Sequence, residues 1–181
     1  CDAVGIQSVF VLQTEKEIRF KKLRIGAKTS SGNGKWLDIH YYHDREACLK
    51  HAYQLVDSIY CACLTDNVKS LHDIALHEPI GLLFGNEHEG VTPETLKMTE
   101  GSFLIPMYGM SQSLNVGIAC AVSLYAVARE REIRGMYAEN ISSTSEQQSL
   151  LLEQYIAKHE AGFNGKIELV DQEMKIEQWK N

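Results

Sequence analysis

The sequence lacks the features that mark several common classes of protein. Its five cysteines are odd in number and form no Cys-x-x-Cys pair. His40 and His43 stand apart from other metal ligands and are expected to be ordinary surface histidines. Four of the cysteines lie inside apolar segments, which predicts buried free thiols in a reducing cytoplasm. No apolar run approaches the roughly 20 residues that cross a bilayer. We therefore expect neither a zinc site nor a membrane helix.

Phosphate-binding motifs are also missing. Residues 85–90 contain glycines, but they have neither the GxGxxG spacing nor a P-loop lysine. Excess positive charge is absent as well, because the formal net charge is −6, which argues weakly against a nucleic-acid partner. The basic residues are nevertheless concentrated in one segment, and the acidic ones gather near residues 168–177. The basic segment contains Lys16, Arg19, Lys21, Lys22, Arg24, Lys28 and Lys35. Such a segment either binds phosphates or is simply a solvated face.

What the sequence contains is an alternation of buried-type strands and helices. Apolar runs predict strands at residues 8–12, 36–42, 58–64, 80–84 and 103–107. Helical patterns cover residues 44–55, 68–75, 92 onward, 113 or 115 to 134, and 145–158, and one or two helical turns are expected within 15–24. The helix after residue 115 is almost entirely apolar at first, so its first turns should be buried. At 181 residues, this pattern predicts one α/β domain with a mostly parallel sheet, followed by a helical extension and a weakly patterned tail.

Two of the predicted strands run directly into loops that carry glycines and polar side chains. In open α/β sheets, ligands bind outside the carboxyl ends of the strands, so these loops are the candidate site. Glu87 and Glu89 are equivalent acidic candidates in the first loop. Asn115 either caps the helix that follows the second loop or binds a ligand. The glycines Gly85, Gly90 and Gly109 serve either turn geometry or close approach of the backbone to a ligand.

The same two loops resemble the second and third motifs of the SpoU-type RNA ribose 2′-O-methyltransferases. Weaker matches to this family, and to its tRNA-modifying TrmH branch, extend the resemblance over residues 1–140. The residues that carry the two main motifs are Leu83-Phe84-Gly85-Asn86-Glu87 with Gly90, then Ile105-Pro106-Met107 with Gly109, and Ser113-Leu114-Asn115-Val116. The residues that carry the weaker matches are Asp2-Ala3-Val4-Gly5, Gly26, Ser30-Ser31-Gly32, Trp36, Gly135-Met136-Tyr137 and Glu139-Asn140.

The resemblance implies a fold and a set of partners. Residues 1–140 would form a domain with the SPOUT α/β fold, whose C-terminal part contains a deep trefoil knot. Residues 141–181 would be a helical extension and a polar tail. The enzyme would be a cytoplasmic homodimer that transfers a methyl group from S-adenosylmethionine to the 2′-OH of a D-loop guanosine in tRNA. Ribosomal RNA is the alternative substrate. Lys21, Lys22, Arg24 and Lys28 are the expected RNA contacts in the basic segment.

The resemblance also implies roles for single residues. The cofactor would be bound by the backbone around Ala62 to Leu64, Gly85, Ile105, Met107 and Leu114. Glu87 and Asn115 would orient the motif loops, and Ser113 would lie near the reacting hydroxyl.

The family assigns proton handling to an arginine of its first motif. That position falls upstream of Cys1, as does the first-motif asparagine, and the chain does not begin with Met. We expect an N-terminal segment to precede the sequence. The alternative is a relative that binds RNA or cofactor without catalysis.

Overall fold

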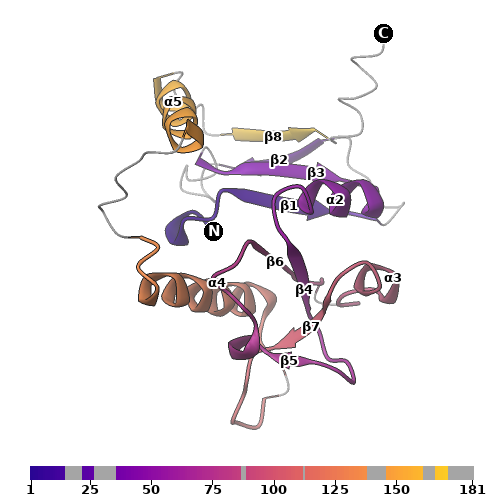
Figure 1. The fold of residues 1–181 in the computed structure, drawn as a ribbon. Coiled ribbons are helices and arrows are strands. Elements are labelled where there is room, and N and C mark those ends of the chain that lie inside the picture. Colours follow the sequence, from indigo (N-terminus) through magenta and orange to yellow (C-terminus); the bar gives the residue numbers. More distant parts are fainter. Residues whose placement is uncertain are drawn as a thin grey trace. The chain divides into compact units, whose positions relative to one another are not determined.

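The computed structural model describes residues 1–14, 22–26, 36–86, 89–111, 113–137, 146–160 and 166–170. The chain is divided into two compact units (Figure 1). Unit 1 comprises Cys1–Cys48 together with Ala138–Asn181, and unit 2 comprises Leu49–Tyr137. Helix α2 (Arg45–Ala52) runs from one unit into the other. It begins as its sequence predicts, because the Asp44 carboxylate accepts a hydrogen bond from the Ala47 amide at 2.8 Å.

The described part of unit 1 contains two pairs of strands. The short 3₁₀-helix η1 (Asp2–Val4) ends at Gly5, whose φ of 73° lies in the left-handed region that favours glycine. Strand β1 (Ser8–Leu12) then pairs in parallel with β3 (Asp38–Tyr42). Strand β2 (Lys22–Gly26) pairs antiparallel with β8 (Lys166–Val170). The helical turns expected within 15–24 are therefore wrong at residues 22–24, and the tail holds a strand that its weak pattern did not predict.

Helix α5 (Glu146–Glu160) packs on the start of β3. The Trp36 ring meets Tyr155 edge-on at a centroid distance of 5.5 Å and stacks on His159 at 6.2 Å. Lys158 Nζ lies 3.1 Å from Asp38 Oδ1. Three side chains of the helix thus contact Trp36 and Asp38, which gives the extension a defined place within unit 1.

His40 in β3 and His43, which directly follows β3, are not simple surface residues. His43 is 8% exposed, and its Nδ1 lies 2.8 Å from the Gln13 carbonyl oxygen. His40 stacks on Phe10, with ring centroids 4.8 Å apart. Both rings are part of the packing around the β1–β3 pair, which corrects the expectation from the sequence.

Unit 2 is built on a four-stranded parallel sheet in the order β5-β7-β4-β6 (Figure 1). Its strands are β4 (Ser58–Ala62), β5 (Lys69–Ser70), β6 (Ile80–Leu83) and β7 (Gly101–Leu104). The helix expected at residues 68–75 is instead strand β5 and a 3₁₀ turn, η4 (Leu71–Asp73). Strand β7 begins two residues earlier than expected. The core of the unit is apolar and contains Leu71, Ile74, Leu76, Phe103 and Val127.

Two helices of unit 2 have the caps that their sequences predict. In α3 (Pro93–Leu96), the Thr92 hydroxyl accepts from the Thr95 amide. In α4 (Val116–Ile133), Asn115 Oδ1 accepts from the Gly117 amide at 2.9 Å. Helix α4 ends where Gly135 takes a φ of 71°, and the Met136 amide bonds back to the Arg131 carbonyl.

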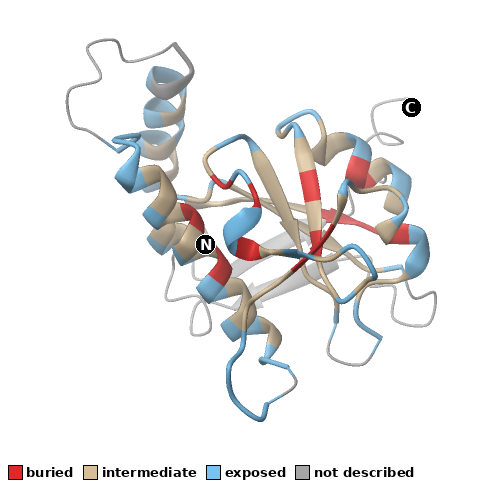
Figure 2. Cartoon of the chain, turned by 60° about the horizontal axis from the view of Figure 1, so that its bottom comes forward, coloured by how far each residue is buried: buried red, intermediate tan, exposed pale blue. Residues whose placement is uncertain are grey.

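The first turns of α4 are not buried as its apolar sequence predicted. Ser123 and Val127 are buried, but Ile118, Val122 and Tyr125 are 54%, 42% and 64% exposed. In Figure 2 most of this helix is coloured as intermediate or exposed. The helix therefore has two apolar faces, and only one of them packs on the core of unit 2.

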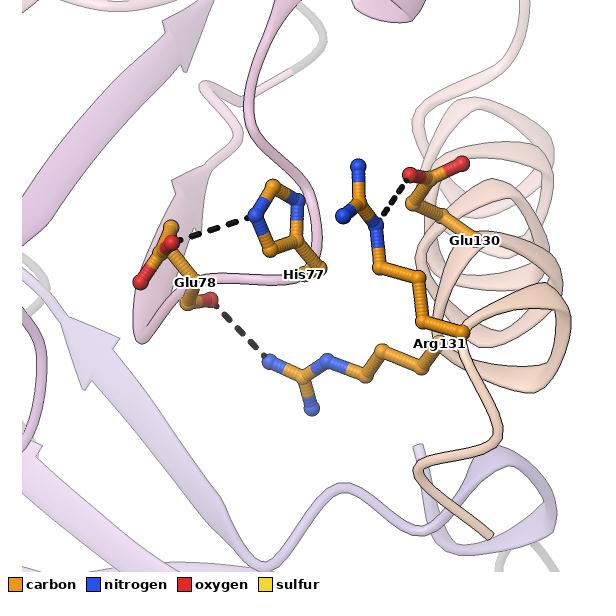
Figure 3. Close-up of polar contacts among 5 residues, drawn as sticks. His77, Glu78, Glu130 and Arg131 are labelled. Atoms are coloured by element: carbon orange, nitrogen blue, oxygen red, sulfur yellow. Dashed lines mark hydrogen bonds and ion pairs between the residues drawn. The ribbon is translucent and has the colours of Figure 1, made fainter.

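The other end of α4 is attached to the turn that precedes β6 (Figure 3). The Arg131 guanidinium donates to the Glu78 carbonyl at 3.2 Å, and His77 Nε2 lies 3.1 Å from the Glu78 carboxylate. One turn along, Arg134 pairs with Glu130 at 2.6 Å. Of these contacts, the Arg131 hydrogen bond joins the C-terminal end of α4 to the turn before β6. Among the helices that the structure describes, none is both long and apolar enough to cross a bilayer.

Candidate active site

The parallel sheet of unit 2 brings both predicted loops to one edge. Strand β4 lies between β6 and β7, and its Cys61 is in register with Leu83 and with Ser102. Because all three strands run in the same direction, the segments after Ala62, Leu83 and Leu104 leave the sheet side by side. The candidate site is the group of residues at this edge.

The first loop, after β6, is a tight turn held by its own backbone. Asn86 Oδ1 accepts from the Glu89 amide at 2.6 Å, and the Gly90 amide donates to the Asn86 carbonyl at 3.1 Å. A Cβ on Gly85 would lie 2.0 Å from the carbonyl carbon of Gly90, which no side chain can tolerate. Gly90 itself has a φ of 69°. Turn geometry therefore explains both glycines.

The structure describes one of the two acidic candidates of this loop. Glu87 lies outside the described residues, so its predicted role in orienting the loops stays a prediction. Glu89 is exposed.

The second loop, after β7, is open. Met107 is 41% exposed, and Tyr108 and Met110 are almost fully exposed. A Cβ added to Gly109 would meet no atom within 4 Å, and the φ of this glycine is outside the left-handed region. Unlike Gly85 and Gly90, Gly109 is required neither by the turn nor by its neighbours. The space beside it fits close approach by another molecule.

The polar candidates lie where this loop enters α4. Ser113 is exposed, and Asn115 caps the helix through its side-chain oxygen. The cap fixes the Asn115 amide group at the start of α4, which is one of the two roles that the sequence predicts for this residue. A cap does not exclude a second role for the same amide group, so the predicted functions of Ser113 and Asn115 stay predictions.

The predicted cofactor contacts surround the same edge. Ala62 ends β4 and is partly buried, whereas Leu64 in the following loop is 77% exposed. Ile105 directly follows β7 and packs on the core, and Leu114 before α4 is 37% exposed. Ala62, Gly85, Ile105 and Met107 lie at or just after the ends of three adjacent strands, and Leu114 lies just before the start of α4. Backbone groups and exposed apolar side chains suit an adenosine-like ligand.

The predicted RNA contacts belong to unit 1. Lys21 and Lys28 lie outside the described residues, and Lys22 and Arg24 are on β2. The strand register places Arg24 opposite Glu168 of β8. Part of the basic segment is therefore paired with the start of the acidic tail.

Among the described groups near the sheet, Cys61, Cys63 and Tyr53 are not activated as nucleophiles. Burial raises the pKa of Cys61 and of Cys63, so both thiols stay protonated near neutral pH. Burial, and next the hydrogen-bonded Glu100 carboxylate, raise the pKa of Tyr53. Tyr53 and Glu100 lie at the amino end of β4, where Glu100 also accepts from the Ile59 amide. Among the described residues, no cluster of His, Cys, Asp and Glu is arranged to hold a metal ion.

One contact at the edge was not predicted. The Thr65 hydroxyl in the loop after β4 is hydrogen-bonded to the hydroxyl of Ser102 in β7, at 2.5 Å. The sequence shows Thr65 as a turn residue, and it places Ser102 just before the predicted strand at residues 103–107, so no local pattern links them. Only the pairing of β4 with β7 brings the two hydroxyls together.

Comparisons with known proteins identify the family of this chain. Residues 1–125 match the model of the SpoU rRNA methylase family. The tRNA (guanosine(18)-2′-O)-methyltransferase of Aquifex aeolicus is 32% identical over 151 residues, which are 83% of this chain and 70% of that protein. The Escherichia coli K12 enzyme of the same name is 32% identical over 154 residues, which are 84% of this chain and 65% of that protein. The chain thus spans about two thirds of the length of these curated relatives.

Solved structures give the same picture. The crystal structure of the A. aeolicus TrmH/SpoU tRNA modifying enzyme superposes with a TM-score of 0.69 and 30% identity, covering 87% of this chain and 78% of that one. The SpoU methyltransferase AviRb from Streptomyces viridochromogenes, in complex with AdoMet, has a TM-score of 0.56 and 20% identity, covering 72% of this chain and 52% of that one. The second likeness concerns the fold alone.

Proposed function

Because this chain belongs to the SpoU rRNA methylase family, we propose that it is an S-adenosylmethionine-dependent tRNA (guanosine-2′-O-)-methyltransferase that acts on a D-loop guanosine. The observation that carries the proposal is the meeting of both family motifs at one edge of the parallel sheet. The loop after β6 and the loop after β7 lie on either side of the end of β4. The relatives that are about 30% identical are named as enzymes of this specificity.

The residues at the edge fit the proposed cofactor. The open space beside Gly109 accepts a ligand close to the backbone. The exposed side chains of Leu64, Met107 and Leu114 offer apolar contacts, and the segments at Ala62, Gly85 and Ile105 offer backbone groups. S-adenosylmethionine supplies an electrophilic methyl group when it is bound.

The chain's own residues would orient the substrate at this position. The ribose 2′-OH must be held in line with the methyl group and must lose its proton during transfer. We assign Ser113 to the vicinity of that hydroxyl, and Glu87 and Asn115 to the orientation of the motif loops. Lys21, Lys22, Arg24 and Lys28 would contact RNA phosphates, as basic side chains commonly do.

A knotted chain path is part of the proposal, and the strand order supports it. Strand β7 lies between β4 and β5, although it follows both in the sequence. Residues 63–68 alone connect β4 to β5 across it. Parallel strands are usually joined by a dozen or more residues, so this short loop encloses β7 closely.

We also propose that the enzyme is a cytoplasmic homodimer. The second apolar face of α4, with Ile118, Val122 and Tyr125 exposed, supports self-association, because exposed apolar stripes of this kind mark protein interfaces.

Methyl transfer tests the proposed function directly. The full chain, with any segment that precedes Cys1 in its gene, is incubated with methyl-labelled S-adenosylmethionine and with unmodified tRNA or ribosomal RNA. We expect label in tRNA, recovered as 2′-O-methylguanosine. Label in ribosomal RNA alone would change the substrate class. Bound cofactor without label in either RNA would leave a non-catalytic RNA-binding relative.

Two substitutions at Asn115 separate its cap from its proposed role. Serine caps a helix about as well as asparagine, so Asn115→Ser preserves α4, whereas Asn115→Ala removes both functions. We expect both variants to lose on the order of a hundredfold in kcat/KM, because misplacement of reacting groups carries a cost of that size. Full activity of Asn115→Ser would reduce Asn115 to a helix cap.

In the same assay, Lys22→Ala and Arg24→Ala should raise KM for tRNA.

A further inference from the structure

The loop at residues 63–68 crosses one face of β7. It leaves β4 at Ala62 and enters β5 at Lys69, and both of these residues are register partners of Phe103. Strand β7 therefore runs beneath the loop. Within the loop, the Val68 amide donates to the Thr65 carbonyl at 3.3 Å, which closes a turn over the strand.

A pair of hydroxyls connects the middle of this loop to β7. Ser102 is 2% exposed, so its hydroxyl is removed from water. Thr65 is half-buried, and its hydroxyl lies 2.5 Å from that of Ser102. A buried hydroxyl needs a partner, because leaving it unpaired costs its full desolvation. Since Ser102 sits in a strand that is paired on both sides, Thr65 is the group whose position is determined by the bond.

We propose that Thr65 and Ser102 are positioning residues for the cofactor. The inference rests on the proposed function, because residues 62–64 become a cofactor-binding segment only if the chain binds S-adenosylmethionine. Thr65 directly follows this segment, and Ala62 at its other end belongs to β4. The hydroxyl pair thus fixes the free end of the segment against β7. Ser102 is buried beneath the loop and acts on the cofactor only through Thr65.

Calorimetric titration of S-adenosylmethionine into the full chain tests the proposal without RNA or turnover. Thr65→Val keeps the shape of the side chain and removes the hydroxyl, and Ser102→Ala removes the buried partner. We expect each variant to raise the Kd on the order of tenfold, as the loss of one hydrogen bond with its unpaired partner predicts. Thr65→Ser should bind like the native chain. The double variant should bind no worse than either single variant, because both substitutions break the same bond.

Thr99→Val is the matched control. The Thr99 hydroxyl donates to the Leu96 carbonyl at 2.8 Å and contacts Cys61 Sγ at 3.4 Å, but it does not touch the loop at residues 63–68. This variant should lower the melting temperature and leave the Kd for S-adenosylmethionine unchanged.

In turnover, Thr65→Val should raise KM for the cofactor with little change in kcat.

Three outcomes would overturn the inference. Native affinity in both Thr65→Val and Ser102→Ala would show that the bond does not position the segment. Weaker binding in Thr65→Val alone would mean that Thr65 contacts the cofactor directly and independently of Ser102. Equal weakening in Thr99→Val would make the effect one of general stability. No binding by the native chain would instead overturn the proposed function, and this inference with it.

Discussion

The two loops at the sheet edge contain Gly85, Gly90 and Gly109, and the structure constrains these three glycines differently. Gly85 is pressed against the backbone of Gly90 and Val91, and Gly90 takes a left-handed φ. Gly109 is under neither constraint. The sequence allowed the same two explanations for all three residues, and the structure separates them. Two of the glycines build their own turn, and the third borders open space.

Alanine should therefore lower the stability of the chain at Gly85 and leave it unchanged at Gly109. In Gly85→Ala, the added Cβ meets backbone atoms that cannot move without opening the turn. We expect the free energy of unfolding to fall by about 3 kcal/mol, as severe overpacking does. In Gly109→Ala, the same methyl group meets no atom of the chain, so stability should stay within about 0.5 kcal/mol.

Urea denaturation and cofactor titration together distinguish the two variants. Gly109→Ala should weaken S-adenosylmethionine binding in a fully folded chain. Unchanged affinity would mean that the space beside Gly109 is not used by the cofactor. A Gly85→Ala variant as stable as the native chain would show that the turn relaxes at no cost.

At the scale of elements, α4 is held at both ends by different means. Asn115 caps its start beside the candidate site, and Arg131 ties its last turns to the Glu78 carbonyl before β6 (Figure 3). The capping residue could be predicted, because Asn before an apolar helical run is a local signal. The Arg131 contact could not be predicted, because Glu78 is far away in the sequence.

Replacing Arg131 tests whether this contact supports the helix. Arg131→Met keeps much of the apolar stem and removes the donor to the Glu78 carbonyl. We expect the free energy of unfolding to fall by about 1 kcal/mol, which is typical of one net hydrogen bond. Chemical denaturation monitored by circular dichroism measures the change.

Arg129 provides the matched control on the same helix. It pairs with Glu132 at 2.8 Å, but both side chains are about two thirds exposed (68% and 64%). Arg129→Met should change stability by less than about 0.5 kcal/mol, since exposed ion pairs contribute little. Equal effects of the two substitutions would mean that the Glu78 contact adds nothing beyond surface charge.

Strand β2 shows how a remote partner overrides a local pattern. Residues 15–24 carry a mixture of charged and apolar side chains that suits a helical turn. In the structure, Lys22–Gly26 pairs along its whole length with Lys166–Val170. Strand propensity depends strongly on such context. The prediction failed because neither segment indicates the other in its own sequence.

For the whole molecule, the exposed face of α4 is an apolar feature that the described part of unit 2 leaves uncovered. Ile118, Val122 and Tyr125 follow one another at helical spacing, and none of them is part of the core cluster of unit 2. An apolar stripe of this length explains why the helix sequence has no polar side in its first turns.

Lysine at Val122 should dissociate the proposed homodimer. A charge in the middle of an apolar interface is costly to bury, whereas it is harmless on a solvated face. Sedimentation velocity should find the native chain at twice its monomer mass and Val122→Lys at the monomer mass. Lys97→Glu, at the exposed end of α3, should remain dimeric. A monomeric native chain would contradict the proposed assembly.

Several features of this protein follow from its sequence alone. Runs of apolar residues predicted β1, β3, β4 and β6 close to their observed bounds, because an apolar run between two turns is a pattern of local sequence. The caps at Asp44, Thr92 and Asn115 followed from single residues before helical runs. The two motif loops identified the family, since they are contiguous stretches of sequence.

Other features were decided only by the tertiary structure. The order β5-β7-β4-β6 places β7 beneath a short loop and brings the Thr65 and Ser102 hydroxyls together. The pairing of β2 with β8, the burial of His43 and the exposure of one side of α4 also depend on segments that are distant in the chain. Local sequence determines where a segment bends and which residues avoid water. Which remote segment then meets those residues is settled by the pairing and packing of the whole chain.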